Sequence, residues 1–90
     1  MIQCKTLIKY HNIDNFVDNV VDRGYFSLYE DPLEKVFIIK NSDVKLLKQI
    51  AKNLKTKYNF KSNIKDDKLF IENYSEMKNL LTLLKLKENN

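Results

Sequence analysis

The sequence predicts an α+β fold in which a mostly antiparallel, five-stranded sheet carries three helices on one face. Two observations favour this fold. Short apolar or alternating segments and longer amphipathic segments follow one another in the order β-α-β-β-α-β-β-α. Each amphipathic segment has one apolar stripe, and three such stripes can be buried together on one face of a sheet. With right-handed crossovers, the simplest topology is a two-layer sandwich with a ferredoxin-like core, an extra hairpin strand and a C-terminal helix.

Length and composition agree with a single domain that covers residues 1–90. Hydrophobic residues make up 43% of the chain and charged residues 31%, a balance typical of folded rather than disordered chains. Cys4 is the only cysteine, so an intrachain disulfide is excluded. No apolar run reaches the roughly 20 residues that a membrane helix needs. We therefore expect a cytoplasmic protein without membrane contact.

The first strand and the first helix are expected before residue 25. Residues 2–10 (IQCKTLIKY) alternate well enough for a strand. The helix that follows is expected to have Asn12 as its N-cap and Gly24 as the left-handed residue that ends it. Its buried stripe is predicted to contain Phe16, Val17, Val20 and Val21.

The middle of the chain predicts a hairpin and a long helix. Residues 25–29 (YFSLY) and 35–40 (KVFIIK) are expected to form strands joined by a turn around Asp31 and Pro32. The helix is expected to begin near Ser42. Its apolar stripe is predicted to contain Val44, Leu47, Ala51, Leu54 and Tyr58.

The last third predicts a second hairpin and a final helix. The hairpin is expected to turn at Asp66 and Asp67. Asn73 and Glu76 have the spacing of a capping box at the start of the helix. The buried stripe of this helix is predicted to contain Met77, Leu80, Leu81 and Leu84.

Two segments 33 residues apart are similar, KVFIIKNSDVKLL at 35–47 and KLFIENYSEMKNL at 68–80. The shift aligns Phe37 with Phe70. One explanation is a repeated unit of a strand followed by a capped helix. The other is chance similarity between amphipathic segments of biased composition.

Strand alternation predicts which residues lie on the sheet face that no helix covers. If Ile8, Ile38 and Ile71 face the helices, their neighbours must face the other way. The uncovered face is then predicted to carry Leu7, Phe37 and Phe70, surrounded by Lys5, Lys9, Lys35 and Lys68. Three alternatives follow: contact with nucleic acid, contact with a protein (a second copy in a homodimer included), or cover by loops or the C-terminal segment.

Residues 45–65 contain seven lysines and no acidic residue. These lysines are Lys45, Lys48, Lys52, Lys55, Lys57, Lys61 and Lys65. On a helix, such spacing is typical of an ordinary solvated face. The run also predicts a local positive field, because residues 35–90 hold 13 basic and 6 acidic groups, a net charge of +7, whereas residues 1–34 have a net charge of −3. The run is thus either a docking surface for a polyanion or a solvated helix face.

Side chains that could carry catalysis are sparse. Asp14, Asp18 and Asp22 recur every fourth residue, which could bind a hard cation but is more typical of a solvated acidic helix face. A zinc site is not expected from His11 and Cys4 alone, since each is the only residue of its type. No nucleotide-binding, nucleophile-elbow or metalloprotease motif is present. We therefore expect no enzyme, no catalytic residue, no metal and no cofactor.

Three stretches resemble a LAGLIDADG homing-endonuclease domain: FVDNVVDRGYFSLYED, FIIKNSDVKLLKQIAKNL and LFIENYSEMKNLLTLL, which lie within residues 16–84. Gly24, Phe26 and Ser27 fit the end of that family's motif. Asp18 and Asp22 stand where the motif has small helix-packing residues, and Arg23 stands where it has a metal-binding acid. The resemblance implies a degenerate domain without nuclease activity that keeps a saddle-shaped sheet for DNA.

In size, charge and lack of motifs, the chain also resembles small phage-encoded inhibitors such as anti-CRISPR proteins, and this resemblance implies the host cytoplasm as its location. We therefore expect a non-enzymatic binding module that acts stoichiometrically on a protein or ribonucleoprotein, such as a host nucleic-acid-handling or defence complex. The alternative is a domain that binds DNA or RNA directly. The predicted binding surface comprises the uncovered sheet face and the run from Lys45 to Lys65.

Overall fold

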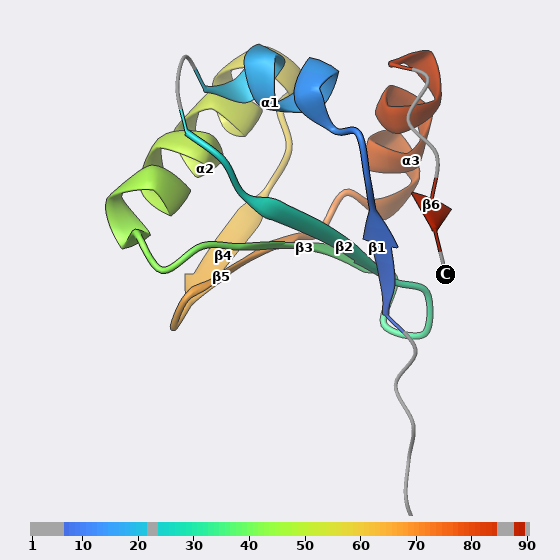
Figure 1. Cartoon of the computed structure of the whole chain (residues 1–90), viewed down its shortest axis with the longest axis horizontal. Helices are drawn as coiled ribbons and strands as arrows, with labels where there is room; N and C mark the ends of the chain where they lie inside the picture. Colours follow the sequence, from blue (N-terminus) through green and yellow to red (C-terminus); the bar gives the residue numbers. More distant parts are fainter. Residues whose placement is uncertain (1–6, 22–23, 85–87, 90) are drawn as a thin grey trace, which may run out of the picture.

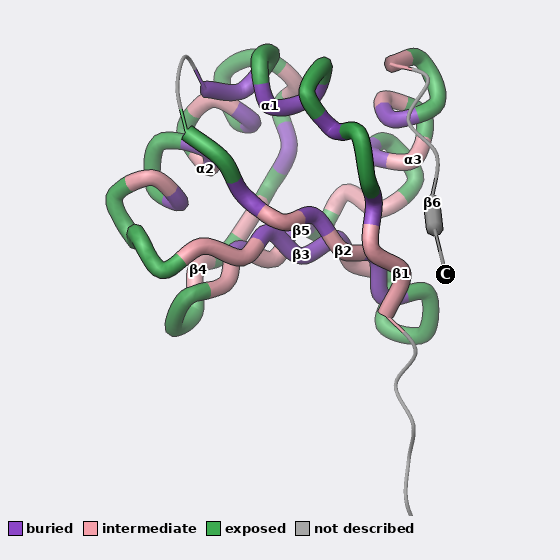
Figure 2. Tube along the Cα trace, in the orientation of Figure 1, coloured by how far each residue is buried: buried purple, intermediate pink, exposed green. Residues whose placement is uncertain are grey.

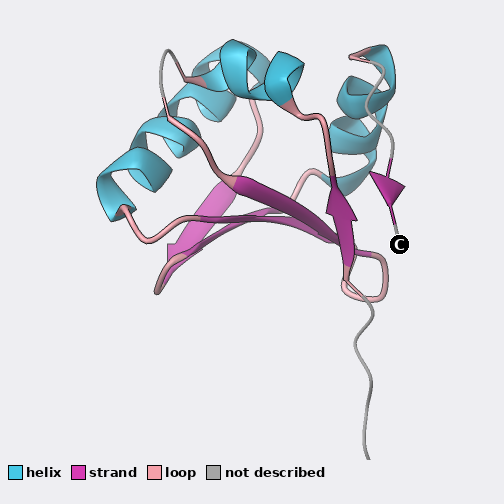
Figure 3. Ribbon diagram, in the orientation of Figure 1, coloured by secondary structure: helices cyan, strands magenta, loops and turns pink. Residues whose placement is uncertain are grey.

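Three helices lie on one side of a twisted antiparallel sheet in the computed structural model of this chain (Figures 1 and 3). The structure describes residues 7–21, 24–84 and 88–89. The elements, in chain order, are β1 (Ile8–Tyr10), α1 (Asp14–Val20), β2 (Ser27–Asp31), β3 (Val36–Lys40), α2 (Val44–Tyr58), β4 (Ser62–Lys65), β5 (Lys68–Ile71), α3 (Tyr74–Leu83) and β6 (Glu88–Asn89).

The sheet has the strand order β4-β5-β3-β2-β1-β6, and every adjacent pair is antiparallel. The predicted α+β class, with three helices on one face of an antiparallel sheet, is confirmed, and β6 adds a short sixth strand. Strands β3 and β4 run in the same direction with β5 between them, and α2 connects them. This is the split β-α-β unit of a ferredoxin-like core. The first half differs, because β1 lies directly beside β2.

One apolar core joins the helices to the sheet (Figure 2). Phe16 and Phe26 meet edge to face, with ring centroids 5.8 Å apart. The helices and strands contribute further fully buried side chains: Val20, Leu28, Ile39, Leu47, Ile50, Leu54, Leu69, Ile71 and Met77. Because all three helices contribute to this one cluster, no helix among the described residues covers the opposite face of the sheet.

Helix α2 has clear signals at both ends. The carboxylate of Asp43 accepts hydrogen bonds from the backbone N–H groups of Lys45 and Leu46, so the helix begins one residue after it. Asn59 ends the helix in the left-handed conformation, with φ of 59°. The predicted start near Ser42 was therefore two residues early.

The ends of α1 differ from the prediction. Asn12 has a positive φ of 57° and lies before Ile13, which holds the N-cap position without a side-chain hydrogen bond. At the other end, Val21 is already extended. Gly24 does adopt a left-handed φ of 117°, but it lies in the connection to β2 rather than at the end of the helix. A Cβ there would lie 3.4 Å from the side chain of Leu46.

Helix α3 begins at Tyr74, directly after Asn73 as predicted. The side chain of Asn73 does not cap the helix backbone. Its Oδ1 instead accepts the backbone N–H of Lys61 at 2.6 Å, and its amide donates to Glu76 at 3.4 Å. Asn73 therefore links the start of α3 to the segment that enters β4.

The predicted faces of β3 are wrong, and the error has a physical cause. Phe37 is fully buried beneath the helices, whereas Ile38 faces the uncovered side of the sheet. The run from Val36 to Ile39 is continuously apolar, so only a charged residue next to it can indicate which alternate residues face the solvent. Lys35 indicates the wrong set, because it lies in the turn with φ of 55°, where strand alternation does not hold. Lys40 lies inside the strand and indicates the correct set.

The strand registers show why the two similar segments differ. Ile38 lies opposite Phe70, and Phe37 lies opposite Ile71. Residues directly opposite each other share a face of the sheet. Phe37 and Phe70, aligned by a shift of 33 residues, therefore lie on opposite faces. The predicted orientations of Ile8, Ile71, Leu7 and Phe70 agree with the structure.

Candidate binding surface

The open face, meaning the sheet face turned away from the helices, carries a row of apolar and aromatic side chains. Across the strands, Tyr29 lies opposite Ile38, and Ile38 lies opposite Phe70. Tyr29, Ile38 and Phe70 form what we call the aromatic row. Lys9, opposite Tyr29, and Asn63, opposite Phe70, lie at its two ends. Tyr29 and Phe70 are partly exposed, and Ile38 between them is 6% exposed although it lies outside the main core. The open face therefore has a small apolar cluster of its own.

A second row runs beside the first and consists of lysines. Lys40 lies opposite Lys68, and Lys68 lies opposite Lys65, on three adjacent strands. Side chains directly opposite each other have Cβ atoms about 5 Å apart, and like charges in this arrangement destabilise a sheet. Among the described residues, the only ion pair of this lysine row joins Lys68 to the exposed Asp67 at 3.4 Å. The row therefore concentrates positive charge along one line.

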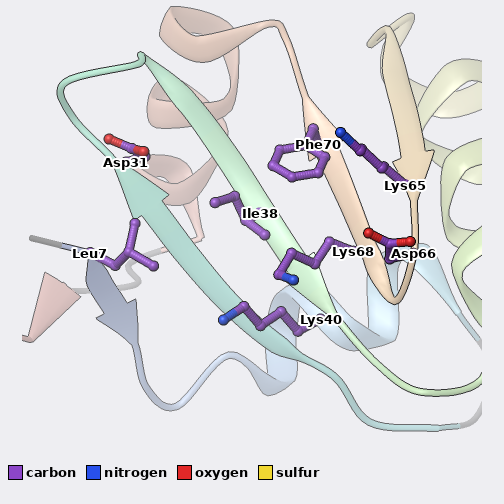
Figure 4. A pocket seen from close by; sticks show the side chains of 8 residues that line it. All are labelled: Leu7, Asp31, Ile38, Lys40, Lys65, Asp66, Lys68 and Phe70. Carbon is purple, nitrogen blue, oxygen red and sulfur yellow. The ribbon is translucent and has the colours of Figure 1, made fainter. Parts of the chain in front are cut away.

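An open hollow of about 340 Å³ lies between these rows and the end of β2 (Figure 4). Figure 4 shows Ile38 between Leu7 and Phe70, with Lys40 and Lys68 on one side of it and Lys65 beside Phe70. The lining residues are Leu7, Asp31, Ile38, Lys40, Lys65, Asp66, Lys68 and Phe70. The hollow therefore combines an apolar floor with a cationic rim.

The acidic residues of this hollow lie at its margins. Asp31 is 2% exposed, and its Oδ1 accepts the backbone N–H groups of Leu33 at 3.2 Å and Glu34 at 3.1 Å. These bonds shape the turn between β2 and β3. Asp66 is exposed and has a left-handed φ of 59° in the turn between β4 and β5. Both carboxylates thus lie in or beside turns at strand ends, and the three lysines outnumber them along the rim of the hollow.

Tyr29 has lysines near its ring. The Nζ of Lys40 lies 4.7 Å from the ring centroid, and the Nζ of Lys9 lies 5.9 Å from it. Cation–π contacts at exposed sites contribute only about 0.5–1 kcal/mol each. A ligand with its own anionic and aromatic groups can therefore replace them.

The predicted lysine run does not form one surface. Lys45, Lys48, Lys52, Lys55 and Lys57 are exposed on α2, in the helical layer. Two of them bond nearby groups: Lys55 donates to Asn59 Oδ1 at 2.8 Å, and Lys57 donates to the backbone oxygen of Asn19. Only Lys65 belongs to the open face. The run is thus divided between the two sides of the sandwich.

A second hollow, of about 470 Å³, lies between α2 and the free edge of the sheet at β4. Lys52, Lys55 and Lys61 line it together with Phe60 and Glu72. Lys61 thus lies near two lysines of the helix, as the run suggested. Asn63, at the end of the aromatic row, also lines this edge hollow, which therefore adjoins the open face at β4.

Several predicted binding residues lie elsewhere. Lys5 falls outside the described residues. Lys35 is exposed in the turn before β3, and Phe37 is excluded from any surface by its burial. Tyr29 and Lys40 were missed, although alternation along SLYED and from Lys40 back through VFII would have placed both on the open face.

A buried carboxylate on the opposite side of β2 was also missed. Glu30 is 1% exposed and accepts hydrogen bonds from the hydroxyls of Tyr10, at 2.9 Å, and Tyr74. Lys78 Nζ lies 3.4 Å from its carboxylate. Burial alone raises the pKa of Glu30, but the two tyrosine hydrogen bonds and the charge of Lys78 outweigh it, so this pKa lies below the ordinary value of 4.5. The rings of Phe37 and Tyr74 stack beside it, 5.4 Å apart.

Other chemistry-bearing residues are dispersed. Asp14 and Asp18 are exposed on α1, His11 is exposed before it, and Asp22 and Cys4 lie outside the described residues. Within the described ranges, no three histidine, cysteine or acidic side chains are grouped so that they could hold a metal ion. The described helices also include none that is long and apolar enough to cross a membrane.

Comparison of the chain with protein-family models, with curated proteins and with solved structures gives no match.

Proposed function

We propose that this protein is a non-catalytic binding module that acts stoichiometrically, by holding an anionic partner on the open face of its sheet. The observation that carries the proposal is the lysine row of Lys40, Lys68 and Lys65 beside the aromatic row of Tyr29, Ile38 and Phe70. Such a surface offers charge for attraction and apolar area for contact. A nucleic acid or a nucleoprotein presents the complementary groups.

The charge arrangement supports an anionic partner over a neutral one. Three lysines on adjacent strands repel one another, and an anion between them converts that repulsion into attraction. The hollow next to them has an apolar floor at Ile38, which gives a bound group a place out of water. Long-range attraction and short-range contact therefore come from the same face.

A second candidate is capture of a protein, as an inhibitor of a nucleic-acid-handling or defence complex would do. The apolar floor of the hollow, from Leu7 through Ile38 to Phe70, favours it, because a partner's apolar side chain could enter there. The two candidates differ in salt dependence. Polyanion binding through several lysines weakens steeply between about 50 and 200 mM salt, whereas apolar capture changes little over that range.

The test compares two pairs of substitutions that lower the net charge equally. Lys40→Gln with Lys68→Gln removes charge from the open face, and Lys45→Gln with Lys48→Gln removes the same charge from the exposed side of α2. Heparin affinity is measured for both at low salt. We expect the open-face pair to lose about tenfold or more and the helix pair to lose about twofold. Equal losses, or no binding by the wild type, would remove the proposal.

A further inference from the structure

We infer that the anionic ligand of the open face is a single-stranded nucleic acid, with phosphates on the lysine row and two unpaired bases on Tyr29 and Phe70. This inference rests on the proposed function and names the class of its ligand. The juxtaposition that carries it is that the two rows, one cationic and one aromatic, run side by side across β3 and β5, with Tyr29 on β2 at one end and Lys65 on β4 at the other.

The spacing of the rows suits a chain with alternating backbone and base contacts. Lys40 follows Ile38 by two residues on β3, and Lys68 precedes Phe70 by two residues on β5. Two residues along a strand span about 6.6 Å. A phosphate held by the lysine row therefore lies within one nucleotide's reach of the aromatic row.

Two bases fit the aromatic row better than one. Tyr29 lies on β2 and Phe70 on β5, with β3 between them. Adjacent strands are about 4.8 Å apart, so the two side chains are about 10 Å apart, more than one ring can bridge. Ile38 fills the interval and supports the edges of both bases. Each aromatic ring can thus stack on a separate base.

The same geometry disfavours a duplex. Stacking requires the face of a base, which is covered by its neighbours in a double helix. Reading a duplex groove requires an element that protrudes into it, and the centre of the open face is a hollow. A duplex could contact the lysine row through its phosphates but would leave Tyr29 and Phe70 without a role.

The experiment measures fluorescence anisotropy of labelled oligothymidylate and oligouridylate of 15 nucleotides, a duplex hairpin of similar charge, and heparin. The variants are Tyr29→Leu and Phe70→Leu, which keep an apolar side chain and remove the ring. Tyr25→Leu is the matched control, because Tyr25 is 62% exposed and lies outside both rows.

We expect single strands to bind more tightly than the hairpin at equal salt. Phe70→Leu and Tyr29→Leu should each weaken single-strand binding about tenfold. The affinity of these two variants for heparin should stay within about twofold of the wild-type value. The affinity of Tyr25→Leu for every ligand should also stay within about twofold of wild type.

The inference is overturned if single strands bind no better than the hairpin, or if neither leucine variant affects them. In that case, if Lys40→Gln with Lys68→Gln still loses more heparin affinity than the α2 pair, the proposed function is supported without this ligand class. An open-face pair that behaves like the α2 pair toward every probe would instead remove the proposed function. If labelled polyglutamate, measured in the same way, binds more tightly than both oligonucleotides, the face is assigned to a protein instead.

Discussion

The two faces of the sheet use similar residues for different purposes, and Phe37 and Phe70 show the difference. Both follow a lysine by two positions in similar segments. Phe37 lies beneath the helices between the rings of Tyr10 and Tyr74, with centroids 5.9 and 5.4 Å away. Phe70 borders an open hollow with cationic neighbours. Phe37 therefore contributes to the core, whereas Phe70 lies on the face that the described helices leave uncovered.

The largest expected effect separates these two phenylalanines. Phe37→Ala leaves a cavity in the core and should lower the free energy of unfolding by about 3–5 kcal/mol. Phe70→Ala removes a partly exposed ring and should cost about 1 kcal/mol. Urea denaturation of both variants measures the difference. Equal losses would show that Phe70 is covered in solution, which would contradict the difference between the two faces.

The next effect concerns the buried carboxylate of the packed face. Glu30→Gln keeps the shape of the side chain but removes the charge that Lys78 and two tyrosine hydroxyls stabilise. We expect a loss of about 2 kcal/mol at pH 7. Glu34→Gln, in the exposed turn after β2, is the control and should change stability by less than about 0.5 kcal/mol.

Glu30 also predicts a pH dependence with a definite sign. Because its pKa in the folded protein lies below the ordinary 4.5, its contribution is fully present above that value and is lost as the pH falls through the folded pKa. The wild type and Glu30→Gln should therefore converge in stability at low pH. Melting temperatures measured between pH 7 and pH 3 check this. A constant gap over that range would contradict the lowered pKa.

The smallest expected effect concerns the lysine row of the open face. Lys68→Gln removes the central charge of the lysine row, which faces Lys40 and Lys65 on both sides. Stability should rise by about 0.3 kcal/mol at low salt, while affinity for oligothymidylate falls. The gain should vanish at about 1 M salt, where surface charges are screened. A loss of stability at low salt would show that the row is neutralised by other groups.

The sequence was sufficient for the order of the elements and for most of the core, because helical stripes such as Leu47 and Leu54 have a clear period. It was insufficient to assign the side chains of β3 to the two faces of the sheet, because four apolar residues in succession show no alternation between apolar and polar residues. The lysine row could not be predicted from the sequence either, since Lys40, Lys65 and Lys68 become neighbours only through the strand registers. Local patterns determine elements, whereas sites depend on pairing between distant segments.

The same reason explains why Glu30 was missed. Its partners Tyr10, Tyr74 and Lys78 come from β1 and α3, 20 to 48 residues away in the chain. A carboxylate at the fourth position of SLYED would usually be exposed, because burying it is unfavourable unless hydrogen-bond or charge partners compensate.

The most direct test of the open face as the working surface is an NMR titration of the ¹⁵N-labelled protein with oligothymidylate. Our expectation is that amide shifts change most at Tyr29, Lys40 and Phe70 and stay nearly constant at Lys45 and Lys48 on α2. The largest changes along α2, with Tyr29 and Phe70 unaffected, would contradict it.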